Sequence, residues 1–197
     1  MSTVAKRLGG RIPILSPRTL SGEQKQVYDR INATQVPWAS NAGFEAQTDD
    51  GGLIGPFNSQ LLSPGINSGY LDMVDAEQKH TSLSKRVREV AILSVGAVWK
   101  SDYEIYAHSA IGRNVGLSES AIKTLAAGGL PDDLNDQEKI AQRYARQLSL
   151  ERRVDPDLYA AAEQSFGRQG LADMIYLIGI YHVVCGFLNS FEVPVPT

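Results

Sequence analysis

The sequence predicts an all-α protein, a single compact domain of about eight or nine helices. Apolar residues recur at helical spacing in nearly every apolar run of the chain. Capping residues precede most of these runs, and the alternation of apolar and polar residues that is typical of strands is missing. The 197 residues, of which 43% are hydrophobic, are enough to form one domain with a sizeable core.

The composition of the chain indicates which kinds of partner and which cellular compartment to expect. The net charge is −3 and no basic stripe is present, so we expect no nucleic-acid partner. One cysteine, Cys185, excludes a disulfide scaffold and an intrachain dithiol. The N-terminus is too polar for a signal peptide, and the longest apolar run, Met174 to Leu188, is interrupted by polar residues. We therefore expect a cytoplasmic protein with no membrane partner.

The N-terminal quarter of the chain is predicted to differ from the rest. Residues 1–20 are rich in proline and are predicted to form an extended arm. A capping box that starts at Ser21 begins a first helix, which is expected to end near residue 33. Residues 34–56 contain many Gly, Pro, Asn and Asp, and are predicted to be irregular. These features suggest a boundary between an N-terminal segment, 1–52, and a helical domain, 53–197.

The remaining helices are placed by their caps and by the residues that end them. They are expected at 55–64 (a short turn), 65–78, 87–99, 101–116, 118–127, 135–150, 156–169 and 171–190. The last of these is apolar nearly all round, which predicts burial on most of its faces.

One stretch of sequence carries the candidate chemistry. It reads REVAILSVGAVWKSDYEIYAH from Arg88, with a helix break predicted at Lys100 and Ser101. After the break, Ser101, Glu104 and His108 lie on one helix face, and the last two are about 6 Å apart along the axis. A carboxylate and an imidazole on one face can share a proton, as general acid–base catalysis requires.

A structural explanation of the same residues is also open. Ser101-x-x-Glu104 fits a capping box, which would satisfy the helix start and could be the whole role of Glu104. His108 would then be a helix histidine without a catalytic role. Glu89 argues against this reading, since it is a lone acid in an apolar run, where an unpaired carboxylate is costly.

The array Glu89-x11-Ser101-x2-Glu104-x3-His108 resembles the carboxymuconolactone decarboxylase and alkyl hydroperoxidase D-like family. The segments GPFNSQLLSP (55–64) and LNSFEVPVP (188–196) also resemble sequences found in members of its decarboxylase branch. The resemblance covers about residues 53–195. It implies a small helical domain in which the two-helix hairpin faces a pocket. It also implies a homo-oligomer, a dimer, trimer or hexamer.

This chain departs from the pattern of the thiol peroxidases in the family, which is Glu-x11-Cys-x2-Cys-x3-His. Ser101 and Glu104 stand at the two cysteine positions, and Tyr103 replaces a histidine often found between them. A dithiol peroxidase needs one thiolate to attack the peroxide and a second thiol to resolve the product. Serine and glutamate can do neither, so the dithiol mechanism is rejected.

The remaining groups suit proton transfer without a redox step. We expect a cofactor-independent acid–base enzyme, decarboxylase- or isomerase-like, that acts on a small organic acid, lactone or enone. His108 would be the general acid or base, Glu104 would share its proton, and Glu89 would be a relay or the partner acid. The candidate substrate-binding residues are Tyr103, Ser101 and His182.

Other readings of the same residues remain open. The protein could be a non-catalytic binding or assembly protein of this fold, or could keep a residual peroxidase-like activity. Glu104 and His108 could bind a metal with Glu89 or His182, although no metal is expected. The three arginines close to the motif, Arg86, Arg88 and Arg113, are predicted to be solvated, and Cys185 to be a small buried apolar residue.

Overall fold

A computed structural model describes residues 8–196, and residues 1–7 of the predicted arm lie outside the described part. The all-α prediction is confirmed: the described residues form eight helices, and their only β pairing is an isolated bridge between Gln47 and Leu53. The contacts group the chain into two compact units, 8–75 with 186–196, and 76–185. The predicted boundary at residue 52 and the predicted oligomer stay predictions.

The first unit contains α2 (Gly22–Ala42), α3 (Pro56–Gln60), most of α4 (Pro64–His80) and the end of the last helix. Its N-terminal segment is anchored by polar contacts. The Arg11 N–H donates to the Phe191 carbonyl at 2.7 Å, and the Asn58 side chain accepts from the Leu15 N–H at 2.9 Å. The described part of the predicted arm therefore packs within its own unit.

The prediction that residues 34–56 are irregular is wrong for the first part of that range. Helix α2 continues through Pro37 and ends at Gly43, whose φ of 90° is left-handed. Ile31, Gln35 and Ala39 are all buried at a spacing of four residues, so one buried face runs through the proline. Proline removes one backbone hydrogen bond, and burial along this face offsets that loss.

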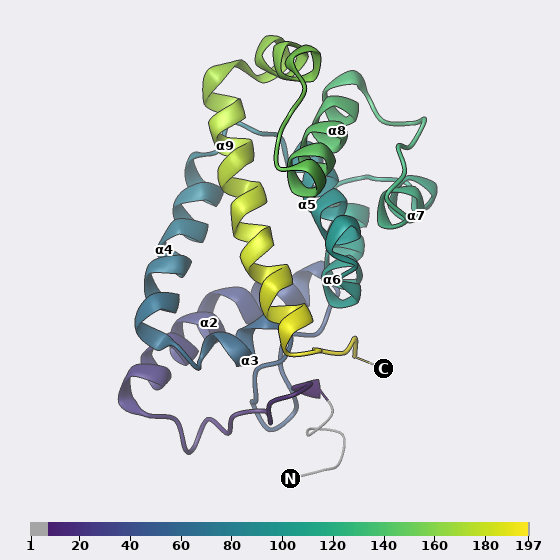
Figure 1. The fold of residues 1–197 in the computed structure, drawn as a ribbon. Coiled ribbons are helices and arrows are strands. Elements are labelled where there is room, and N and C mark those ends of the chain that lie inside the picture. Colours follow the sequence, from purple (N-terminus) through teal and green to yellow (C-terminus); the bar gives the residue numbers. More distant parts are fainter. Residues whose placement is uncertain (1–7, 197) are drawn as a thin grey trace. The chain divides into compact units, whose positions relative to one another are not determined.

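The second unit is built around α5 (Lys85–Trp99), with α6 (Asp102–Asn114), α7 (Glu119–Ala126) and α8 (Asp136–Glu151) packed against it (Figure 1). Val90 and Leu93 of α5 join the core around α7. The core shared with α8 and α9 contains Val87, Ala91, Ile92 and Val95. Helix α5 is therefore buried on two sides, which explains why Ser94 is the only polar residue from Val90 to Val98.

The last helical segment, α9 (Pro156–Ser190), is interrupted at Gly167, which has a φ of 67° and a ψ of 175°. Two helices were predicted, with the break at Gly170, so the break lies three residues earlier than expected. Only glycine adopts this backbone conformation readily, which identifies Gly167 as the residue that allows the bend.

Two predictions about α9 need correction. Burial on most faces was expected, yet Ile175, Tyr176 and Val183 are exposed. The chain was also expected to contain no apolar run of membrane-spanning length, whereas α9 is long and apolar enough to qualify. Length and composition are weak evidence here, because Leu171, Met174 and other α9 residues pack in the core with α5 and α8, as in a core helix of a soluble protein.

Candidate active site

A tight reversal of the chain brings α5 and α6 together. Helix α5 ends at Lys100, which has a left-handed φ of 52°, and Ser101 is extended with φ −94° and ψ 97°. The Ser101 N–H donates to the Gly96 carbonyl at 3.0 Å, which closes the end of α5. The predicted helix break at Lys100 and Ser101 is confirmed, and the two helices form an antiparallel pair in direct contact.

Gly96 allows the close approach of the two helices at Glu104. A Cβ atom added at Gly96 would lie 3.1 Å from the Ile105 Cδ1 and 3.2 Å from the Glu104 Cγ. Both distances are shorter than ordinary van der Waals contacts, so a larger residue would push α6 or its side chains away. The glycine therefore positions the Glu104 carboxylate against α5.

Three side chains of this helix pair meet in the interior. The His108 Nδ1 lies 2.7 Å from the Glu89 Oε2, and the His108 Nε2 lies 3.3 Å from the Glu104 Oε1. The imidazole thus stands between two carboxylates, one on each ring nitrogen. Less than a tenth of each side chain is exposed. The structure therefore brings together the three predicted catalytic residues.

The two carboxylates change the proton affinity of His108. Burial disfavours the charged imidazolium, but the negative charges of Glu89 and Glu104 favour it more strongly, and the hydrogen bond that His108 donates to Glu89 adds to their effect. The pKa of His108 is therefore raised, although the nearby positive charge of Arg88 opposes the rise. The raised pKa favours the imidazolium form of His108, and Glu89 orients the ring through its hydrogen bond with the Nδ1.

Glu104 has a different balance. Burial raises its pKa to about 7, the charge of Glu89 pushes in the same direction, and the charge of His108 opposes both. Because Glu104 and His108 interact directly, their protons titrate as a coupled pair. The pair can therefore release or accept a proton close to neutral pH.

The capping-box explanation of Ser101 and Glu104 is wrong. The Ser101 side chain makes no capping hydrogen bond, and the Ser101 N–H already donates to Gly96. The Glu104 carboxylate faces His108 instead of the helix start. Within the described residues, 8–196, both the Ser101 Oγ and the Glu104 Oε1 are buried without a hydrogen-bond partner, which is costly for polar atoms and typical of functional sites.

The structure adds two residues of α9 that the sequence reasoning did not place in the site. The Tyr181 ring meets the His108 ring edge to face, with centroids 4.9 Å apart. Cys185 is fully buried near Ser101 and Glu104. Tyr181 and Cys185 are four residues apart and so share one helix face, which is the signal that could have linked them to a common site.

The chemistry of Cys185 is that of a neutral thiol. Burial raises its pKa far above the usual range, and the negative charge of Glu104 raises it further. The nearby Ser101 hydroxyl acts in the opposite direction but is outweighed. The expectation that Cys185 is a small buried residue is confirmed, and a thiol in this state is a poor nucleophile.

Two predicted substrate-binding residues make other contacts. The His182 Nε2 lies 2.8 Å from the Ser149 Oγ, its ring lies 5.7 Å from that of Trp99, and burial lowers its pKa. Tyr103 is buried, with its ring 5.7 Å from that of Tyr106. Ser101, the third predicted substrate-binding residue, lies close to Cys185, as Glu104 does.

The prediction that the arginines near the motif are solvated is wrong for two of them. Arg88 forms an ion pair with Glu77, and both side chains are largely buried. The Arg86 Nε bonds to the buried Glu138 carboxylate at 2.7 Å. Both guanidinium groups are therefore committed to structural ion pairs. The metal alternative has no support, since the described residues contain no group of three His, Cys, Asp or Glu able to hold a metal.

The fold and site together define a helical protein with a buried Glu–His–Glu arrangement on an α5–α6 hairpin. Residues 64–147, which include this hairpin, match the sequence model of the carboxymuconolactone decarboxylase family. This match supports the resemblance that the Glu89-to-His108 array carries. No curated protein matches the sequence.

Solved structures with the same fold are distant in sequence. A peroxidase-related protein with an alkylhydroperoxidase AhpD core, from Ralstonia eutropha JMP134, is 18% identical, with a TM-score of 0.75 over 95% of this chain and 93% of its own. A peroxidase-related protein from Silicibacter sp. TM1040 is 11% identical, with a TM-score of 0.71 over 96% and 93%. The debrominase Bmp8, solved with 2,3,4-tribromopyrrole, is 12% identical, with a TM-score of 0.64 over 85% and 89%. At these identities the likeness shows the fold alone.

Proposed function

We propose that this protein is a cofactor-independent acid–base enzyme that acts on a small organic acid, lactone or enone. The observation that carries the proposal is the placement of the His108 ring between two buried carboxylates, one of which has a pKa of about 7. A group that titrates near the working pH is the most effective general acid or base. The debrominase of the same fold supports an enzyme, since it shows that this architecture carries catalysis elsewhere.

Each residue has a distinct role in the proposed reaction. Glu89 accepts the Nδ1–H of His108, which holds the ring in place and stabilises its positive charge. Glu104, when ionised, removes a proton from the carbon next to the substrate carbonyl. The imidazolium stabilises the resulting enolate through its Nε2–H, and the protonated Glu104 or His108 returns the proton to another position. The same groups could protonate the enolate that remains after loss of CO2.

A redox mechanism has less support. The two cysteine positions of the peroxidase pattern hold Ser101 and Glu104, and the one thiol of the chain has a strongly raised pKa. Attack on a peroxide requires a thiolate, which Cys185 forms only at high pH. Proton transfer, in contrast, needs only an acid–base group that titrates near neutral pH, and the buried Glu104 beside His108 is such a group.

Exchange of substrate protons with D2O tests the proposal before the full reaction is known. A panel of small lactones, enones and keto acids is incubated with the protein in D2O, and NMR measures deuterium incorporation at the carbon next to the carbonyl. We expect exchange with at least one class, and a loss of about 10²- to 10⁴-fold in the variant His108→Gln. Arg113→Gln, which changes an exposed ion pair, is the matched control and should exchange at the wild-type rate.

Two results would contradict the proposal. The first is exchange at the wild-type rate in a folded His108→Gln protein, since proton transfer would then occur elsewhere. The second is the absence of exchange with the whole panel together with tight binding of one of its members. That result would favour the non-catalytic binding protein of the same fold.

A further inference from the structure

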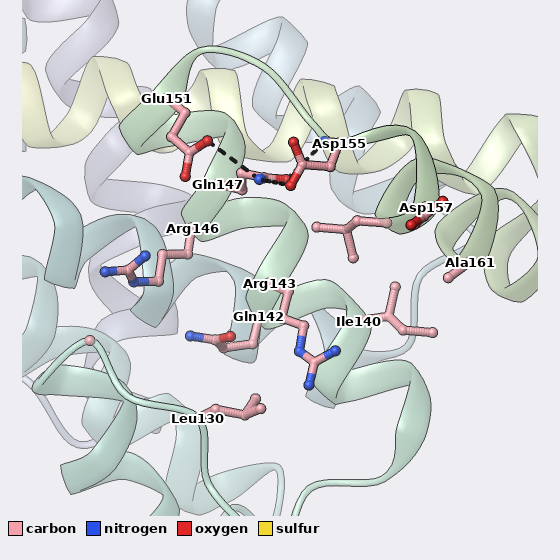
Figure 2. Close-up of a pocket in the computed structure, with 12 residues that line it drawn as sticks. Leu130, Ile140, Gln142, Arg143, Arg146, Gln147, Glu151, Asp155, Asp157 and Ala161 are labelled. Atoms are coloured by element: carbon pink, nitrogen blue, oxygen red, sulfur yellow. Dashed lines mark hydrogen bonds between the residues drawn. The ribbon is translucent and has the colours of Figure 1, made fainter.

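A surface pocket of the unit 76–185 lies away from the buried Glu–His–Glu arrangement. It has a volume of about 650 Å³, which is within the range of small-molecule sites, and it is formed by α8, the loop before it and the start of α9 (Figure 2). All of its lining residues belong to the unit 76–185. Neither Glu89, Glu104 nor His108 lines it, so it is a separate candidate site.

Two arginines of this pocket have no carboxylate partner among residues 8–196. Arg143 and Arg146 project from α8, three residues apart and thus on one helix face, and both are exposed. Neither forms an ion pair within residues 8–196, whereas the other arginines of this unit named above, Arg86, Arg88 and Arg113, each pair with a glutamate. An arginine fork without a partner is suited to hold a carboxylate through two hydrogen bonds.

Two of the three acidic residues that line the pocket, Glu151 and Asp155, are hydrogen-bonded to a neutral side chain, Gln147. The Gln147 Nε2 donates to the Asp155 Oδ2 at 2.7 Å and to the Glu151 Oε2 at 3.4 Å, and the Asp155 N–H donates to the Gln147 Oε1. Figure 2 shows Glu151, Asp155 and Asp157 along one edge, with Arg143 and Leu130 on the opposite side. Three carboxylates against two guanidinium groups disfavour a polyanion, so an anionic ligand of this pocket could carry at most one negative charge, which it would place beside Arg143 and Arg146.

Apolar side chains complete the surface around the arginines. Leu130, Ile140, Leu158 and Ala161 line the same space. Buried Gln142 donates through its Nε2 to the Gly129 carbonyl at 3.1 Å, which holds the loop that carries Leu130 against α8. A ligand with a compact apolar body could therefore cover this apolar surface while its charged end reaches the arginines.

We propose that this pocket is a second ligand site, which binds a small monocarboxylate with an apolar body through Arg143 and Arg146. Benzoate is a suitable probe, and benzamide is its neutral counterpart of the same size. Calorimetric titration of the full chain at low ionic strength should show saturable benzoate binding with a Kd on the order of 1 mM. Benzamide should bind at least about tenfold more weakly, because the charge-assisted hydrogen bonds are lost.

Three single variants locate the binding. Arg143→Gln and Arg146→Gln should each weaken benzoate binding at least about fivefold, since each removes one charged fork. Arg153→Gln carries the same change of charge at an exposed position outside the pocket, and should bind as the wild type does. All three positions are exposed, so the variants should remain folded, which circular dichroism checks.

The pH dependence separates this pocket from the buried site. Guanidinium groups stay charged throughout the accessible range, so benzoate binding should be constant between about pH 6 and pH 9. Binding beside Glu104 would weaken as that carboxylate ionises near pH 7. The proposal is overturned if benzoate does not bind saturably, if benzamide binds equally well, or if both arginine variants bind as the wild type does. The proposal is also overturned if His108→Gln loses benzoate binding while both arginine variants keep it, because the ligand would then lie at the buried site.

Discussion

Glu104 and Glu138 are both almost completely buried at helix starts in the same unit, yet their surroundings differ. Glu138 is held by Arg86 through two hydrogen bonds and by the Asn135 N–H in a capping box, and these donors lower its pKa. Glu104 has no such donors: burial raises its pKa to about 7, and its Oε1 has no hydrogen-bond partner. A buried acid that is fully satisfied stabilises the fold, whereas one left unsatisfied keeps a proton available for chemistry.

The comparison predicts opposite effects of the same substitution. Glu138→Gln should lower the free energy of unfolding at pH 8 by about 2 kcal/mol, because it leaves Arg86 without its carboxylate, although the partial exposure of Arg86 limits the loss. Glu104→Gln should raise it at pH 8 by on the order of 2 kcal/mol, because a neutral amide replaces a carboxylate that is costly to bury. Urea unfolding of both variants measures these changes.

The dependence on pH sharpens the difference. The folded-state pKa of Glu104 is raised, so the folded protein binds more protons than the unfolded chain between about pH 4.5 and pH 7, and stability falls as the pH rises through that window. Glu138 has a lowered pKa, so its stabilisation is present above about pH 4.5 and is lost as the pH falls. The gain from Glu104→Gln should therefore shrink as the pH falls below 7 and vanish below about pH 4.5. A gain of equal size at pH 5 and pH 8 would contradict this assignment.

The helices that carry Glu104 and Glu138 could largely be predicted from local sequence. The break at Lys100 and Ser101 and the start of a helix at residue 135 depend on residues close together in the chain, and both predictions are confirmed. The choice between a capping and a chemical role for Glu104 could not be made in the same way. It depends on where α5 lies, because the partner groups of Glu104 are His108 and, through it, Glu89.

The parts of the site that were missed come from distant segments. Tyr181 and Cys185 lie more than seventy residues after His108, and nothing in their local spacing indicates which helix they face. Arg88 was expected to be solvated because charged residues usually are, but its partner Glu77 lies on the preceding helix, within the same buried region. Pairing between elements, unlike helix formation, depends on tertiary contacts.

Glycines on α5 and α9 offer a second, smaller contrast. Gly96→Ala should lower the free energy of unfolding by about 1 to 2 kcal/mol, because the added Cβ crowds Glu104 and Ile105. Gly179→Ala is the matched control: nothing lies within 4 Å of its added Cβ, so the helix should gain up to about 1 kcal/mol. Thermal unfolding of both proteins compares them. Equal effects at the two positions would mean that Gly96 is not required for the close approach of α6.

The smallest expected effect concerns Cys185, which lies beside Glu104 as a neutral thiol. In Cys185→Ser the rate of proton exchange should change by no more than about threefold, because the thiol neither ionises near neutral pH nor carries the transferred proton. The hydroxyl is a stronger hydrogen-bond donor than the thiol, so it could reach the unsatisfied Ser101 Oγ or Glu104 Oε1 and shift the pH optimum slightly downward. A loss of activity comparable to that in His108→Gln would instead make the sulfur itself part of the reaction. The rate and its pH profile, measured together, therefore distinguish a neighbour of the acid–base pair from a redox group.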